Sequence, residues 1–384
     1  ISSAASDVYK RQYLKRLMKN SVINIRPLSH FYNMPLYESG ESVIEGKENV
    51  VKLSANENMN GPCNEVLNQF AYYSKNIFEY PDSSHFALRR KIGEIHDLDP
   101  NRIICGAGSD EIIQLLCRCF CDKNDEVIYT EHGFLMYKLS ALAAGAKPIK
   151  VKERNRTASV ENICAAITAR TKMIFLANPN NPTGTMISET EVEELLNKIP
   201  DNILLVLDGA YSEYVDSCDG GISLVNKYGN LFVTRTFSKI FGLGGLRVGW
   251  GYGARDITDV LNSVRSPFNV SSLGLKMAEL SIADVKFVNE QRELNRVNRE
   301  ALRNKLLSLG LEIDQSFANF LLLRFLSEEQ ANTIDLFLKG KGFILRKVGS
   351  YGLPKCLRLS IGSKEICEKL YATLAEYFEK NERV

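Results

Sequence analysis

Between about residues 100 and 270, short apolar runs alternate with amphipathic stretches of helical period. The apolar runs predict buried strands at 102–105, 126–130, 148–151, 172–177, 203–208, 231–236 and 248–252. The stretches between them predict helices at 109–121, 133–144, 159–168 and 188–199. Strands and helices that alternate at this spacing indicate an α/β fold, with a mostly parallel seven-stranded sheet covered by helices on both faces. Such sheets bind ligands at the carboxyl ends of their strands, so the loops after the strands are the ones to search.

The pattern changes after residue 270. Residues 272–308 have no proline and few glycines, which predicts one long helix or two joined helices. Apolar runs at 320–325, 343–346 and 356–360 predict strands, and 364–379 predicts a final helix. We therefore expect a large domain over 50–270 and a smaller α+β domain built from 21–49 and 271–384.

Composition narrows the class of protein. Of 384 residues, 45% are hydrophobic and 24% are charged, which is ordinary for a globular protein. The formal net charge of +2 gives no reason to expect nucleic acid or an anionic membrane as a partner. No apolar run is long enough to predict a membrane span. Nine cysteines without a Cys-x-x-Cys pair indicate free thiols in a reducing cytoplasm, and neither the cysteines nor the four histidines have metal-ligand spacing.

The first residues do not read as part of a fold. Residues 2–12, SSAASDVYKRQ, resemble a translated sequencing adapter, and they lack the apolar region of a secretory signal. Met18 is a plausible native start. We expect residues 1–20 to be disordered and artefactual.

A lysine with phosphate-binding neighbours follows the strand predicted at 231–236. Thr236 and Ser238 flank Lys239, a glycine-rich loop follows, and Arg247 comes eight residues later. Hydroxyl groups and arginine are typical of phosphate binding. Partial burial near a cationic group would lower the lysine pKa and make the amine a nucleophile. The segment therefore indicates a Schiff base with a phosphorylated aldehyde.

Two other strand ends carry polar residues. The run at 203–208 ends in Asp208, with Tyr211 three residues on; this carboxylate could pair with a pyridinium nitrogen or cap a turn. After 172–177 comes Asn178-Pro179-Asn180-Asn181-Pro182, a rigid loop with candidate cis bonds that can place an asparagine in the cleft.

A glycine turn also follows the first strand. Gly106-Ala107-Gly108-Ser109-Asp110 leads into a predicted helix, whose first N–H groups can hold a phosphate. The turn lacks the third glycine of a dinucleotide fingerprint, since residue 111 is Glu.

These four segments, in this order and spacing, resemble the fold-type I pyridoxal 5′-phosphate (PLP) aminotransferases, and within them the histidinol-phosphate aminotransferases of the class II subfamily. The segments 53–58, 80–82 and 357–362 extend the resemblance over roughly residues 24–380. The resemblance implies transfer of an amino group from L-histidinol phosphate to 2-oxoglutarate, giving imidazole-acetol phosphate and L-glutamate in histidine biosynthesis.

The resemblance also implies roles around the cofactor ring. Lys239 would carry the cofactor as a Schiff base and shuttle a proton, while Asp208 would pair with the ring nitrogen. Asn181 and Tyr211 would contact the phenolic oxygen of the ring. Phe134 stands where the family often has a tyrosine that stacks on the ring, and a phenyl face suffices for stacking.

Further residues are implied at the phosphate and at the substrate. The residues implied to hold the cofactor phosphate are Gly108, Ser109, Asp110, Ser238 and Arg247, with Thr236 nearby. Tyr80 would reach the cofactor phosphate of a partner subunit, which implies a homodimer with shared active sites. Arg346 and Arg358 would bind the anionic end of the substrate, and Tyr37 would close over it.

One departure and several alternatives stay open. The family usually has Asp-Glu-Ala-Tyr where this chain has Gly209 after Asp208, which weakens the subfamily assignment. An aromatic or broad-specificity aminotransferase and a threonine-phosphate decarboxylase are alternatives within the superfamily. A regulatory protein of the same fold without turnover is disfavoured by the intact Lys, Asp, Asn and Tyr set. A nucleotide-binding dehydrogenase is disfavoured by the missing glycines.

Overall fold

The computed structural model describes residues 28, 30–31, 34–37 and 39–380, and the expectation for residues 1–20 lies outside them. The chain separates into two compact units, 1–35 and 36–384. All elements below belong to the second unit. In the described part of the chain, no helix is both long and apolar enough to cross a bilayer.

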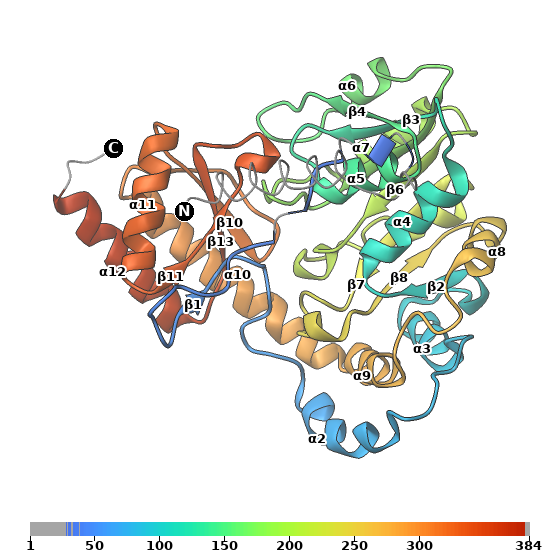
Figure 1. The fold of residues 1–384 in the computed structure, drawn as a ribbon, viewed down its shortest axis with the longest axis horizontal. Coiled ribbons are helices and arrows are strands. Elements are labelled where there is room, and N and C mark those ends of the chain that lie inside the picture. Colours follow the sequence, from blue (N-terminus) through green and yellow to red (C-terminus); the bar gives the residue numbers. More distant parts are fainter. Residues whose placement is uncertain (1–27, 29, 32–33, 38, 381–384) are drawn as a thin grey trace, which may run out of the picture. The chain divides into compact units, whose positions relative to one another are not determined.

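A seven-stranded sheet lies in the right-hand part of Figure 1, in the order β2-β8-β7-β6-β5-β3-β4. Its strands are β2 (Ile103–Gly106), β3 (Glu126–Thr130), β4 (Lys147–Val151), β5 (Thr171–Ala177), β6 (Leu204–Asp208), β7 (Leu231–Thr236) and β8 (Gly249–Tyr252). The neighbours from β4 to β7 pair in parallel, whereas β8 pairs antiparallel with both β7 and β2. The predicted mostly parallel seven-stranded sheet is confirmed.

Both faces of this sheet are buried, and side chains along its strands point alternately into two hydrophobic clusters. On β6, Leu205 and Leu207 enter one cluster and Val206 enters the other, as the two-residue period of a strand requires. Elements that contribute to the first cluster include α2 (Asn64–Tyr73), α3 (Phe86–His96), α6 (Val160–Ala165), α7 (Glu189–Lys198) and α9 (Ser272–Ala283). The second cluster includes side chains of α4 (Ser109–Phe120), α5 (Leu135–Ala143) and α8 (Arg255–Val264).

A smaller antiparallel sheet has the order β12-β13-β10-β9. Its strands are β9 (Glu312–Ile313), β10 (Phe320–Arg324), β12 (Arg346–Lys347) and β13 (Cys356–Ser360). Its core includes side chains of α10 (Val285–Leu307), α11 (Glu328–Gly340) and α12 (Lys364–Lys380). A separate parallel pair joins β1 (Val51–Lys52) to β11 (Phe343–Ile344).

The region 272–308 forms two joined helices, one of the two predicted arrangements, because the Asp284 side chain caps α10, accepting the Phe287 N–H at 2.9 Å. Two other predicted elements differ from the structure. The single strand predicted at 343–346 is wrong, since the chain leaves β1 after Ile344 and joins β13 at Arg346. The helix predicted at 159–168 ends early, at Ala165. The domain boundary near residue 270 stays a prediction, and the apolar side chains of α9 belong to the core of the large sheet.

Candidate active site

A cavity of about 400 Å³ opens at the carboxyl ends of β5, β6 and β7. Thirteen of the predicted site residues line it: Tyr37, Ser109, Asp110, Phe134, Asn181, Asp208, Tyr211, Thr236, Ser238, Lys239, Arg247, Arg346 and Arg358. Asn181, Asp208 and Lys239 meet there because β5, β6 and β7 are parallel and end at the same edge of the sheet. Arg346 and Arg358 come instead from β12 and β13 of the smaller sheet. Gly108 and Tyr80 are not among the lining residues.

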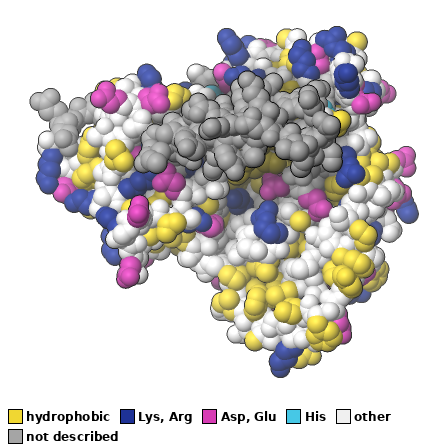
Figure 2. All heavy atoms as spheres, in the orientation of Figure 1, with side chains coloured by type: hydrophobic (Ala, Val, Ile, Leu, Met, Phe, Trp, Pro, Cys, Tyr) yellow, Lys and Arg dark blue, Asp and Glu magenta, His cyan; other side chains and the backbone are white. Residues whose placement is uncertain are grey.

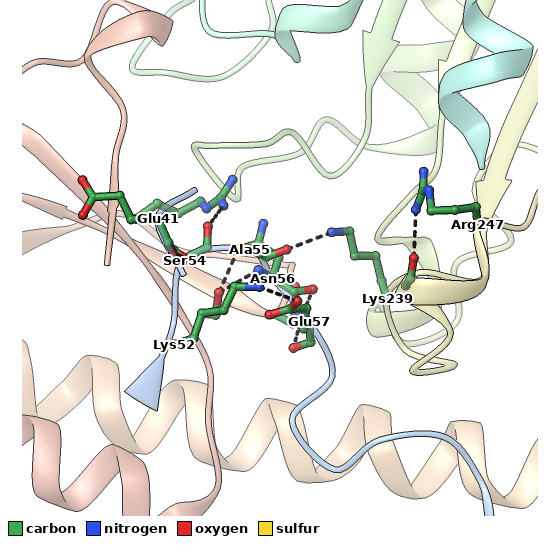
Figure 3. A network of polar contacts seen from close by, with 12 residues as sticks. Glu41, Lys52, Ser54, Ala55, Asn56, Glu57, Lys239 and Arg247 are labelled. Carbon is green, nitrogen blue, oxygen red and sulfur yellow. Dashed lines mark hydrogen bonds and ion pairs between the residues drawn. The ribbon is translucent and has the colours of Figure 1, made fainter. Parts of the chain in front are cut away.

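Lys239 lies three residues beyond β7 and projects across the cavity (Figure 3). Its Nζ donates a hydrogen bond to the carbonyl oxygen of Ala55 at 3.2 Å, and it lies 5.6 Å from the centre of the Tyr211 ring. Burial, reinforced by the positive charge of Arg358, lowers the pKa of the Lys239 amine to about 8. An amine with this pKa is partly uncharged at neutral pH and can attack a carbonyl carbon.

Asp208 is the last residue of β6 and is buried. Its carboxylate accepts hydrogen bonds from the Tyr137 hydroxyl at 2.7 Å and from the Thr234 hydroxyl at 3.1 Å. Burial raises the pKa of Asp208, while these two hydrogen bonds favour its ionised form. A buried carboxylate that lines a cavity is suited to a cationic ring nitrogen.

The turn before α4 faces the segment that follows Lys239. Arg247 donates to the Ser238 hydroxyl and to the Asp110 carboxylate, at 3.2 Å in each case. Gly108 has a φ of +81°, and a Cβ at this position would lie 2.5 Å from the Arg247 guanidinium. Glycine is therefore favoured at this position, because residues with a side chain rarely adopt this φ. Hydroxyls, a guanidinium and a helix start meet here, which is the chemistry that binds a phosphate.

The loop at 178–182, which follows β5, contacts the smaller sheet at the cavity. Both of its Asn-Pro bonds, 178–179 and 181–182, are cis. Arg358 on β13 donates to the side-chain oxygen of Asn181, and it also donates to the carbonyl oxygen of Ser54 at 2.6 Å. Burial lowers the pKa of Arg358, and its Nε has no hydrogen-bond partner among the described residues. Because Arg358 also lines the cavity, its positive charge lies beside the space that an anionic ligand would occupy.

Aromatic rings surround the rest of the cavity. The rings of Tyr37 and Phe134 meet edge to face with their centres 6.4 Å apart. Burial raises the pKa of Tyr37 and of Tyr351, so both hydroxyls stay protonated at neutral pH. Phe134 is the residue directly before α5, and its ring lines the cavity.

Tyr80 lies on the exposed surface of the described chain. Its side chain is 82% exposed and stacks on Phe268, with the ring centres 4.6 Å apart. The structure therefore does not bring Tyr80 into the cavity of its own chain. A role for this residue at a partner's site stays a prediction.

Sequence reasoning missed several residues that hold the site. Tyr137 carries the hydrogen bond to Asp208, but its position on the buried face of α5 is typical of a core residue. Asn56 donates to the Tyr211 hydroxyl at 2.9 Å and lies 155 residues away from it. Tyr351 reaches the cavity from a short 3₁₀ turn, Gly349–Tyr351. Of the three, only Asn56 stood in a segment that the family resemblance had marked.

Comparison with known proteins places this site in a family. The family model "Aminotransferase class I and II" matches residues 48–374. A histidinol-phosphate aminotransferase from Ruegeria sp. (strain TM1040) is 49% identical over 353 residues, covering 92% of this chain and 98% of the relative. One from Paracoccus denitrificans (strain Pd 1222) is 47% identical over 360 residues, covering 94% of this chain and 98% of the relative.

Solved structures agree in fold. The histidinol-phosphate aminotransferase from Sinorhizobium meliloti, in complex with pyridoxal-5′-phosphate, superposes with a TM-score of 0.86 at 23% identity, covering 94% of this chain and 99% of that one. An aromatic aminotransferase from Pyrococcus horikoshii OT3 gives a TM-score of 0.77 at 18% identity, covering 88% of this chain and 98% of that one. On the family match and these sequence identities, the chain belongs to the class I and II aminotransferases.

Proposed function

We propose that this chain is a PLP-dependent transaminase that moves the amino group of L-histidinol phosphate to 2-oxoglutarate, giving imidazole-acetol phosphate and L-glutamate in histidine biosynthesis. The observation that carries the proposal is the cavity that unites Lys239, Asp208 and Arg358. Relatives named histidinol-phosphate aminotransferase, 47–49% identical over more than nine-tenths of the chain, support the choice of substrate.

The residues around the cavity fit the cofactor. The Lys239 amine is partly uncharged near neutral pH, as attack on an aldehyde requires. The Asp208 carboxylate would pair with the ring nitrogen, and Asn181 and Tyr211 would contact the phenolic oxygen of the ring. Phe134 would offer an aromatic face for stacking. The cofactor phosphate would be held by Gly108, Ser109, Asp110, Ser238 and Arg247, with Thr236 beside them.

The chemistry divides between the cofactor and the chain. When bound, PLP supplies an aldehyde carbon that takes up amines and a ring that withdraws electrons from the substrate Cα. Lys239 would remove the proton from the substrate Cα and deliver a proton to the carbon that was the aldehyde carbon of the cofactor. Asp208, whose ionised form is favoured by hydrogen bonds from the Tyr137 and Thr234 hydroxyls, would hold the positive charge on the ring nitrogen. Arg358 and Arg346 would orient the phosphate or carboxylate end of each substrate, with Tyr37 closing over it.

An exposed apolar patch supports a homodimer with shared active sites. It lies over α2 and the segment that follows (Figure 2), and its exposed side chains are Leu67, Phe70, Tyr72, Ile77, Phe78, Tyr80 and Phe86. Contiguous exposed apolar patches of this kind mark protein interfaces. A partner covering this patch would receive Tyr80, whose hydroxyl would then reach the partner's cofactor phosphate. A cytoplasmic location is consistent with nine free cysteines.

Amino transfer assays test the substrate. We expect the purified chain to transfer nitrogen from L-histidinol phosphate to 2-oxoglutarate faster than from phenylalanine or tyrosine. Borohydride reduction should leave the cofactor fixed on the peptide that contains Lys239, and a Lys239→Ala variant should lose this label and the activity. Absence of transfer from histidinol phosphate would refute the proposed substrate.

An aromatic aminotransferase is the second candidate, because the rings of Tyr37, Phe134 and Tyr351 line the cavity. Efficient transfer from phenylalanine or tyrosine, without transfer from histidinol phosphate, would favour it. Release of carbon dioxide from threonine phosphate would instead identify a decarboxylase.

A further inference from the structure

The turn that leads into α4 is held from behind by a residue that does not line the cavity. The Glu111 carboxylate accepts the backbone N–H of Ala107 at 2.6 Å. The same oxygen accepts the side-chain amide of Asn269 at 2.7 Å. Asn269 also donates to the carbonyl oxygen of Cys105 at 3.2 Å. Two side chains, Glu111 and Asn269, therefore hold the backbone at Cys105 and Ala107, where β2 passes into the turn before α4.

Asn269 is itself held in place by Arg265, the residue that follows α8. Arg265 donates to the Asn269 side-chain oxygen at 3.2 Å and to the Asn262 side-chain oxygen at 2.8 Å. Arg265 also donates to the backbone carbonyl of Ser83. Because the side-chain oxygen of Asn269 accepts from the Arg265 guanidinium, its amide NH2 group is the end that faces Glu111.

The turn has little freedom on its other side. A Cβ on Gly249 of β8 would lie 2.4 Å from the backbone nitrogen of Ser109. Gly108 has a φ of +81°, and an ideal Cβ there would lie 2.5 Å from the end of the Arg247 side chain, which places the guanidinium against the turn. The turn therefore lies between β8 and Arg247 in front and the Glu111 carboxylate behind. A small rotation of the Ala107 peptide would redirect the N–H groups at the start of α4.

We propose that Glu111 and Asn269 are positioning residues that aim the N–H groups of the Gly108–Ser109 turn at the cofactor phosphate. This inference rests on the proposed function, since it presupposes that PLP binds in the cavity. Neither side chain lines the cavity, and both act through the backbone of Ala107 and Cys105. The consequence is selective, because only a ligand that carries the phosphate depends on the direction of these N–H groups.

A second glutamate that accepts a backbone N–H at the start of its own helix gives a matched control. Glu191, in the first turn of α7, accepts the backbone N–H and the hydroxyl of Ser188, at 2.8 Å each. Replacing Glu191 by alanine removes a comparable contact at a helix start, but α7 contributes no residue to the cavity lining. Any general effect of weakening a helix start appears in both variants, and an effect on the phosphate appears only at Glu111.

The experiment compares two ligands that differ by the phosphate. The purified full chain and its variants are freed of cofactor and titrated with PLP and with pyridoxal, while the thermal midpoint of the unloaded protein is recorded. We expect Glu111→Ala to raise the Kd for PLP about tenfold or more, the size typical of losing a charged hydrogen bond. The Kd for pyridoxal should stay unchanged. Glu111→Gln should restore PLP binding, because its amide oxygen still accepts both N–H groups.

Two further variants complete the design. Asn269→Ala should raise the Kd for PLP in the same direction and leave pyridoxal unaffected, and Glu191→Ala should change neither. Equal losses for PLP and pyridoxal in Glu111→Ala, or an unaltered Kd for PLP, would overturn the inference. If Glu111→Ala does not fold, the Asn269→Ala variant tests the inference through the ratio of its Kd for PLP to its Kd for pyridoxal. A natural chain that fails to bind PLP would refute the proposed function itself, whereas tight binding that no variant alters refutes only the positioning role.

Discussion

The buried amine of Lys239 should destabilise the cofactor-free protein, so replacing it with methionine should stabilise the fold. Burial lowers the pKa of this amine from 10.5 to about 8. At 1.36 kcal/mol per pKa unit, the folded chain loses about 3 kcal/mol when Lys239 is charged at pH 7. Methionine has a similar length without the charge.

Part of this gain is offset by a lost hydrogen bond. Lys239 donates to the Ala55 carbonyl at 3.2 Å, and removing that donor costs about 1 kcal/mol. The net gain expected for Lys239→Met is therefore about 2 kcal/mol at pH 7, since the electrostatic contribution is the larger. The gain should shrink with rising pH. Between about pH 8 and 10.5 the unfolded lysine holds a proton that the folded one has released, so the stability of the natural chain rises over this window.

Urea unfolding of the cofactor-free proteins at pH 7 and pH 10, at equal protein concentration, measures both effects. Lys172→Met, at an exposed position of β5, is the control and should show neither the gain nor its pH dependence. A Lys239→Met variant that is no more stable than the natural chain at pH 7 would refute the reasoning. A gain that is the same at both pH values would show that packing, rather than the charge, produces it.

Two further predictions concern the ring nitrogen and the subunit interface. Tyr137→Phe removes a 2.7 Å hydrogen bond to Asp208 and should weaken PLP binding about tenfold or more in a titration, whereas Tyr129→Phe, at another buried tyrosine, should not. Equal effects of the two would contradict the role of Tyr137. Phe78→Arg, at a side chain 79% exposed in the apolar patch, should shift the protein toward monomers in sedimentation, whereas Leu336→Arg on α11 should not. A Phe78→Arg protein that stays dimeric would exclude this patch as the interface.

The parts of the site that sequence alone could predict share one physical origin. Asn181, Asp208 and Lys239 follow strands that run parallel, and parallel strands end at one edge of a sheet. Their meeting could therefore be expected from apolar runs and chain order. Lys239 and Asp208 do line one cavity.

The parts that sequence could not predict depend on contacts between distant segments. Arg358 bonds Ser54 across 304 residues, and no local pattern encodes that pairing. Tyr137 packs its ring flat against Phe175, with the centres 4.7 Å apart, so the residue reads as core and only its hydroxyl serves the site. The split between β11 and β12 escaped prediction for a related reason, because Ile344 and Arg346, only two residues apart, pair with strands of two different sheets.

The same depressed basicity that suits Lys239 to its cofactor exposes the empty chain to chemical damage. Near neutral pH, a lysine with a pKa of about 8 is uncharged roughly a few hundred times more often than an ordinary surface lysine. Reactive sugars and dicarbonyl metabolites that enter the cavity would meet an amine that is uncharged far more often than an ordinary lysine side chain. A freshly synthesised chain is thus most vulnerable to glycation before it is loaded, which makes prompt delivery of vitamin B6 a form of protection as well as activation.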